Sequence, residues 1–199
     1  GTTAKVCLID EGQPQTARTF EVAREYRFLK GSGIPLRIPV IEMVEIGAGG
    51  GSIAGVDSMR RISVGPESAG SNPGPVCYGL GGKLPTVTDA DVTLGRIDPN
   101  NFAGGSMRLD SESSADALKR SVGDLLGFSL EHAALGVSEI VDENMANAAR
   151  VHAIESGKNI DARTLVAFGG AAPIHVSRLA EKLRVDRVVI PPGAGVGSA

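Results

Sequence analysis

The sequence predicts a mixed α/β chain on three observations. Sixteen of the 27 glycines and seven of the 11 prolines lie in residues 31–105, where turns and short strands are expected because each such residue weakens a helix interior by about 1–3 kcal/mol. Apolar residues recur at helical spacing through 110–157. Residues 164–190 then predict a strand, a Gly-Gly pair, a helix and a strand, which is the order of a parallel α/β unit. We therefore distinguish a glycine-rich strand and loop portion, 1–105, from helices followed by a strand–helix–strand unit, 106–199.

The first portion predicts three strands. Residues 3–9 and 19–23 are strand-like, and the turn 10–14 between them predicts a β-hairpin. Residues 39–46 (PVIEMVEI) predict a third strand that runs into the glycine-rich turn 47–52. Ser52, at the end of that turn, can cap a short helix or begin another strand, and the pattern favours neither.

Two helices are predicted in the second portion. The first can be capped by Asp110 or Ser111 and ends near Gly127, whereas the second begins at Ser129 and ends at Gly157. The expected buried faces are Ala115, Leu118, Val122 and Leu125 in the first helix, and Val137, Ile140, Val141, Met145, Ala148, Val151 and Ile154 in the second.

The C-terminal unit is predicted to be a parallel pair of strands with a crossover helix. Residues 164–168 form a buried-type strand, the helix runs from Pro173, a favourable first-turn residue, to Leu183, and residues 187–190 form the second strand. We expect the helix to pack on the two strands through Leu179 and Leu183.

Composition excludes several classes of function. The 199 residues carry a net charge of −3 without a basic block and only seven aromatic rings (Phe 5, Tyr 2), which argues against a nucleic-acid or anionic-membrane partner. The uncharged stretches are too short and too glycine-rich to span a bilayer. Cys7 and Cys77 cannot form a disulfide framework, so a reduced, cytoplasmic protein is expected. Because the chain begins inside a strand-like pattern and ends at Gly-Ser-Ala, we expect a piece of a longer protein.

Glycine clusters at strand ends are the first candidate binding sites. A glycine-rich turn presents unpaired N–H groups and lets an anion approach closely. The candidates are Gly49, Gly50 and Gly51 in the turn 47–52, and Gly169 with Gly170. Tight turns by themselves explain most glycine pairs, and this alternative stays open. The Gly1-Thr2-Thr3 segment offers two hydroxyls, from Thr2 and Thr3, that could hold a phosphate.

An acidic stretch is the second candidate site. Asp89 and Asp91 could supply carboxylate oxygens to Mg²⁺ and would share a face only if the chain were extended there. Cys77 could join them as a soft ligand for zinc or another metal. The alternatives are that Asp89 caps a turn of helix over Val92 and Leu94, and that Cys77 is a small buried hydrophobe.

The three histidines differ in position. His132 and His152 lie on the long predicted helix as surface or packing residues, whereas His175 follows the Gly169–Gly170 turn and could approach a ligand bound there.

Seven short strings follow one another along nearly the whole chain. They are GAGGGSIA (47–54), VGPESAG (64–70), PGPVCYGLGG (73–82), PTVTDA (85–90), LGRID (94–98), AFGGAAPIH (167–175) and PPGAGVGSA (191–199). This order resembles the hydantoinase A / 5-oxoprolinase family, which includes ATP-dependent N-methylhydantoinase and the related subunits of acetone and acetophenone carboxylases.

The resemblance implies a fold and a cofactor. The family is similar to the actin, sugar-kinase and chaperone ATPases, in which two ribonuclease-H-like lobes, each a mixed sheet with flanking helices, close over a nucleotide. In the family, an Asp-Met-Gly-Gly-Thr-Thr turn forms a phosphate loop, and the segment Gly1-Thr2-Thr3 is similar to its second half. By the same carry-over, Gly169 and Gly170 face the adenosine. Residues 1–199 would then be part of an incomplete second lobe that binds ATP and Mg²⁺.

The activity implied by the resemblance is phosphoryl transfer to a carbonyl. ATP would phosphorylate the carbonyl or enolate oxygen of a small cyclic amide, as in an N-methylhydantoinase or 5-oxoprolinase, with a hydantoinase B-type subunit or domain as partner. The alternatives are a subunit of an ATP-dependent ketone carboxylase and a non-catalytic actin-like ATPase module. The stretch PGPVCYGLGG…PTVTDA favours an enzyme, since a nucleotide switch has no evident need for it.

Overall fold

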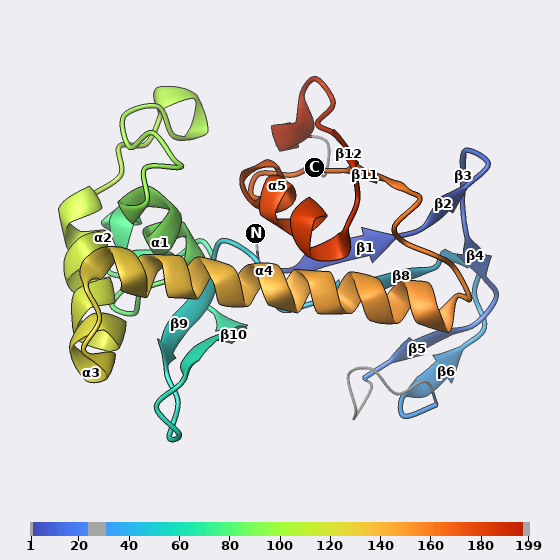
Figure 1. The fold of residues 1–199 in the computed structure, drawn as a ribbon, viewed down its shortest axis with the longest axis horizontal. Coiled ribbons are helices and arrows are strands. Elements are labelled where there is room, and N and C mark those ends of the chain that lie inside the picture. Colours follow the sequence, from blue (N-terminus) through green and yellow to red (C-terminus); the bar gives the residue numbers. More distant parts are fainter. Residues whose placement is uncertain (1, 24–30, 197–199) are drawn as a thin grey trace.

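The computed structural model of the chain describes residues 2–23 and 31–196 (Figure 1). Gly1 of the predicted phosphate turn and the end of the string 191–199 lie outside the described residues. The longest element is helix α4 (Leu130–Glu155), which runs along the long axis of the molecule and contacts strands and helices from both portions of the chain.

The first eight strands form a long, irregular antiparallel arm. They are β1 (Ala4–Cys7), β2 (Ile9–Asp10), β3 (Gln13–Pro14), β4 (Thr16–Ala17), β5 (Phe20–Val22), β6 (Ile34–Leu36), β7 (Val40–Ile41) and β8 (Met43–Ile46). Strand β1 pairs with β8, β4 with β7 and β5 with β6, while β2 and β3 make a two-residue hairpin. Proline and turn residues keep the individual strands short.

The predicted hairpin between residues 3–9 and 19–23 is wrong. Ala4 is opposite Ile46 in the β1–β8 ladder, and residues 20–22 pair with β6. The physical reason is burial, because pairing with β8 places Ala4 and Val44 beside Ile46 against the main hydrophobic core. That contact is far apart in sequence, so local turn residues do not report it.

The glycine-rich region continues as a hairpin and a short helix. Ser52 begins strand β9 (Ser52–Val56), which pairs antiparallel with β10 (Ile62–Ser68), and this decides the alternative left open by the sequence. The 3-10 turn η1 (Val76–Tyr78), helix α1 (Val87–Thr93) and a second 3-10 turn (Ala103–Gly105) follow.

The predicted helix boundaries are confirmed. Helix α2 (Ser111–Leu118) is capped by Asp110 and continues through a π-helical turn (Lys119–Gly123) and α3 (Asp124–Leu126) to Gly127, whose φ is +72°. Ser129 caps α4, and Gly157 follows its end with a φ of +65°.

Two residues of the predicted buried faces are exposed. Leu125 is 52% exposed and Ile154 is 75% exposed. The π-helical turn rotates the face of the first helix before Leu125, and Ile154 lies in the last turn of α4. The core positions Leu118, Val122 and Val137 are fully buried as predicted.

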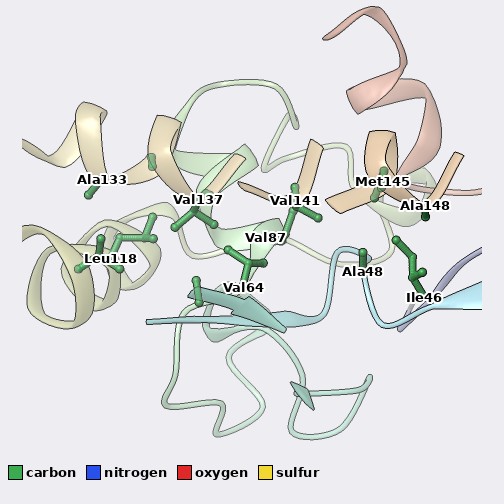
Figure 2. Close-up of a cluster of buried hydrophobic side chains, with 14 residues drawn as sticks. Ile46, Ala48, Val64, Val87, Leu118, Ala133, Val137, Val141, Met145 and Ala148 are labelled. Carbon is green, nitrogen blue, oxygen red and sulfur yellow. The ribbon is translucent and has the colours of Figure 1, made fainter. Parts of the chain in front are cut away.

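The main core lies between α4 and the glycine-rich region. Figure 2 shows Val137 and Val141 of α4 next to Val64 of β10 and Val87 of α1. Alanines dominate the inner face of α4 and allow the neighbouring strands and helices to approach closely. Through this core, α1 and the turn 47–52 pack against α4, which is also the helix against which α5 packs.

The C-terminal unit agrees with the predicted topology. Strands β11 (Thr164–Val166) and β12 (Arg187–Val189) pair in parallel, and helix α5 (Ala172–Leu183) connects them. Leu179 and Leu183 pack beside Leu165 in a second cluster with α4. The strand is not buried as predicted, because Thr164 and Val166 are exposed, Val166 to 48%, and only Leu165 is half-buried.

The fold is therefore mixed α/β, with six two-stranded sheets among the described residues in place of one larger mixed sheet. The strands are two to seven residues long, too short and too often interrupted to extend into a continuous sheet. The ribonuclease-H-like lobe stays a prediction. None of the helices among residues 2–23 and 31–196 is long and apolar enough to cross a membrane.

Candidate functional site

Helix α1 anchors the glycine-rich turn 47–52. Both the backbone N–H and the hydroxyl of Thr88 donate hydrogen bonds to the carbonyl of Gly50, at 2.8 and 2.9 Å. A Cβ on Gly50 would lie 2.6 Å from the Thr88 hydroxyl oxygen, so this position has no room for a side chain. The Gly49 N–H donates to the buried Ser52 hydroxyl at 3.0 Å. These hydrogen bonds fix the turn between the end of β8 and the start of β9.

Asp89 organises the segment before α1. Its buried carboxylate accepts hydrogen bonds from the backbone N–H groups of Val76, Cys77 and Thr86 at 2.8–3.1 Å and from the hydroxyls of Thr86 and Ser114 at 2.9 and 2.7 Å. Thr86 is the N-cap of α1 and forms a capping box with Asp89. The alternative that Asp89 caps a turn of helix over Val92 and Leu94 is confirmed in part, because the N-cap is Thr86 and Asp89 is the third helical residue of the capping box. The lone pairs of Asp89 are occupied by protein donors.

The three predicted metal ligands do not converge on one site. Because Asp89 and Asp91 lie two positions apart on a helix, their side chains point in different directions, and the extended conformation that would align them is absent from α1. Burial raises the pKa of the Cys77 thiol, with the charge of Asp89 adding to the effect, so the thiol is a poor metal ligand. Residues 2–23 and 31–196 contain no group of three His, Cys, Asp or Glu side chains suited to a metal.

Asp91 instead joins a buried charge cluster between three helices. Nδ1 of His175 on α5 lies 2.8 Å from Asp142 on α4, and Nε2 lies 3.2 Å from Asp91 on α1. Arg96 pairs with Asp91 at 3.3 Å and also donates to the Ser138 hydroxyl. His175 is 1% exposed.

The two carboxylates favour a charged imidazole. Burial by itself would lower the pKa of His175, but hydrogen bonds and attraction from Asp142 and Asp91 outweigh it and raise the pKa to about 9. The cluster therefore fixes the first turn of α5, and the Gly169–Gly170 turn just before it, relative to α1.

A cavity of about 260 Å³ brings two of the predicted phosphate-binding residues together. Thr2 and Gly51 line it, together with Gly70, Ser71 and Tyr78. The last three residues were not candidates from residue chemistry. They belong to the strings VGPESAG and PGPVCYGLGG or lie between them, which is the signal that could have identified them.

The remaining predicted residues lie elsewhere. Thr3 accepts a hydrogen bond from the Lys5 ammonium at 2.5 Å on the exposed side of β1. Gly169 is buried with a φ of +97°, and its N–H donates to the Ala194 carbonyl at 2.6 Å. Gly170 is exposed, and a Cβ there would meet nothing within 4 Å. The Gly169–Gly170 turn and the cavity are thus separate features connected through α1.

Comparison with known proteins identifies the family. The Hydantoinase/oxoprolinase family matches residues 1–199, and the chain belongs to this family. It is 45% identical over 191 residues to the alpha subunit of caprolactamase from Pseudomonas jessenii, covering 96% of this chain and 26% of that protein. It is 36% identical over 203 residues to the beta subunit of acetone carboxylase from Xanthobacter autotrophicus, covering 100% of this chain and 27% of that protein.

A solved structure shares the fold of this chain. The nucleotide-free structure of acetone carboxylase, described in connection with ATP-dependent acetone carboxylation, superposes with a TM-score of 0.86 at 33% identity, covering 98% of this chain and 26% of that chain. The chain thus spans about a quarter of the length of these relatives.

Proposed function

We propose that the chain is part of an ATP-dependent enzyme that activates a carbonyl by phosphorylation, acting as a cyclic-amide hydrolase. The observation that carries this proposal is the cavity that Thr2 shares with Gly51, Gly70, Ser71 and Tyr78. In it, Thr2 of the predicted phosphate turn lies next to Gly51 of the glycine-rich turn and next to Ser71 and Tyr78. The cyclic-amide assignment is supported by the likeness to the caprolactamase alpha chain.

The residues of this chain would act mainly by positioning. An amide carbonyl resists attack, and transfer of a phosphoryl group to its oxygen makes that oxygen a leaving group. The N–H groups and hydroxyls of Thr2 and of the turn 47–52 would orient the phosphates, while the Gly169–Gly170 turn would lie along the adenosine. Such positioning supplies much of the rate enhancement in phosphoryl transfer.

Mg²⁺ would accompany the nucleotide in this scheme. Its usual ligands are carboxylates, waters and substrate phosphates, but the Asp89 oxygens are already filled by five donors and Asp91 is paired with Arg96 and His175. Neither of the two predicted carboxylates is therefore available to a protein-bound ion.

A role in a ketone carboxylase is the second candidate. The superposition on acetone carboxylase over 98% of this chain supports it. In that case, the phosphorylated enolate would be carboxylated and not hydrolysed. A hydantoinase B-type partner is proposed for either activity, since the relatives are named as subunits. The cytoplasm stays the predicted location.

Turnover of ATP by the full-length polypeptide together with its proposed partner tests the function. We expect ADP release to rise at least tenfold when hydantoin, a simple lactam or a ketone is added. Dependence of the ketone reaction on bicarbonate would assign a carboxylase, whereas ring opening without bicarbonate would assign a hydrolase. ATP turnover that ignores every carbonyl compound would favour a non-catalytic ATPase module and refute the proposal.

A further inference from the structure

We propose that His175 is a positioning residue for the nucleotide, which holds the Gly169–Gly170 turn at the distance from the turn 47–52 that a ligand spanning both turns requires. The inference rests on the proposed function, in which the adenosine lies along the first turn and the phosphates lie along the second. His175 is 1% exposed, so it would act only through these two turns and not by touching the ligand.

A continuous path of contacts leads from the turn 47–52 to His175. The carbonyl of Gly50 accepts two hydrogen bonds from Thr88, the second residue of α1. Asp91 lies one turn further along the same helix, and its Oδ2 lies 3.2 Å from Nε2 of His175. Because successive turns of one helix keep a fixed geometry, the position of the imidazole is tied to that of the glycine-rich turn.

The Gly169–Gly170 turn lies on the other side of His175. His175 belongs to the first turns of α5, which begins at Ala172 directly after the glycines. Gly169 is buried with a φ of +97°, and its N–H donates to the carbonyl of Ala194. These constraints determine the shape of the turn, whereas the start of α5 determines where the turn lies relative to α1.

A charged imidazole is suited to hold two carboxylates from different helices. Its Nδ1 lies 2.8 Å from Oδ1 of Asp142 on α4, while Nε2 faces Asp91 on α1. The protonated ring carries an N–H on both nitrogens, but the neutral ring has only one and would set a lone pair against a carboxylate. The pKa of His175, raised to about 9, keeps both N–H groups at neutral pH.

Loss of the imidazole should shift α5 and leave it folded on α4. The Oδ2 atom of Asp142 is buried without a hydrogen-bond partner among residues 2–23 and 31–196, so His175 supplies the charge that balances this carboxylate, and a buried unbalanced charge is costly. The apolar contacts of Leu183 and the ion pair between Arg178 and Glu139 hold α5 on α4 independently of His175.

The consequence is specific to a ligand that contacts both turns. A ligand with two linked contacts gains affinity when the two contact sites are fixed at the matching distance, and it loses this gain when the geometry forbids both contacts at once. ATP spans the two proposed turns. Adenosine or inorganic tripolyphosphate would contact one turn only, so the distance between the turns should not affect its affinity.

The test compares His175→Gln and Asp91→Ala in the full-length polypeptide with its partner. Calorimetric titration should give a dissociation constant for ATP that rises at least about tenfold in both variants, with those for adenosine and tripolyphosphate within about twofold of the wild type. Asp91→Ala breaks the link to α1 and keeps the pair of His175 with Asp142, so it decides the question if His175→Gln does not fold. Arg178→Gln is the matched control, because Arg178 pairs with Glu139 of α4 and with Glu181 of α5 on the exposed side of the same helix pair.

Two results would overturn the inference. Equal weakening of ATP, adenosine and tripolyphosphate would make His175 a general structural residue, and unaltered ATP affinity in both variants would remove any positioning role. Turnover of ATP with and without a carbonyl compound is followed in the same proteins. If ATP alone lost affinity in the variants but the wild-type turnover ignored every carbonyl compound, the proposed function would be refuted and the positioning role would stand. Carbonyl-dependent turnover with unaltered ATP affinity in the variants would have the opposite meaning.

Discussion

Asparagine in place of Asp89 would remove one acceptor oxygen from the residue that holds η1 against α1. One oxygen, Oδ2, accepts from Val76, from the backbone of Thr86 and from its hydroxyl. The other oxygen, Oδ1, accepts from Cys77 and from the Ser114 hydroxyl. In Asp89→Asn the amide oxygen can take over the first set. The amide nitrogen then faces the Cys77 N–H, and two donors meet.

The magnitude follows from these contacts. The Ser114 hydroxyl can rotate to accept from the new amide, but the Cys77 N–H cannot, and a buried donor without an acceptor costs about 1–3 kcal/mol. The other bonds lose the charge on their acceptor, which makes each of them weaker. We expect a total cost of about 3–5 kcal/mol, a large part of the roughly 5–15 kcal/mol that stabilises a typical domain.

Hydrogen exchange of the full-length polypeptide, followed by mass spectrometry of the peptide 73–82, measures this cost locally. A decrease of about 3 kcal/mol in the free energy of local opening accelerates amide exchange on the order of 100-fold. Asp98→Asn is the matched control, since Asp98 is exposed and accepts one backbone hydrogen bond, from Asn100 at 2.9 Å. Unchanged protection of 73–82 in Asp89→Asn would refute the reasoning. A second result would also refute it. If Mg²⁺ without nucleotide increased the protection of 73–82 in the wild type but not in Asp89→Asn, Asp89 would be a metal ligand.

Two further predictions concern helix α5 and the turn before it. The pKa of His175 is raised to about 9 in the folded protein. The contribution of the charged imidazole to the free energy of unfolding should therefore be fully present below about pH 6.5 and be lost as the pH rises to about 9. The effect is on the order of 3 kcal/mol, and denaturant unfolding from pH 6 to 10 should show this loss in the wild type and not in His175→Gln. Gly170→Ala should change the melting temperature little, since Gly170 has open space around it, but should weaken ATP binding tenfold or more if the turn lies against the nucleotide. Unaltered ATP affinity in calorimetry would remove Gly170 from the site.

The helical part of the fold could be predicted from the sequence because its signals are local. Asp110 and Ser129 cap their helices by hydrogen bonds to residues three positions away, and the apolar spacing of α4 defines a face within a few turns. The parallel pairing of β11 with β12 also follows from a short-range rule, since a strand–helix–strand connection brings the two strands side by side. The ordered strings identified the family without any structure.

Tertiary structure decided what the glycine-rich portion does. The partner of β1 lies about 40 residues away in β8, and only burial against α4 selects it. Asp89 and Asp91 form one short acidic motif in the sequence, but the helix turns the first toward η1 and the second toward His175. Thr2 and Tyr78 come from segments that are far apart in the sequence, and both line a single cavity. Residue types and local spacing determined the elements and the family, whereas the convergence of these side chains depends on long-range packing that no local pattern encodes.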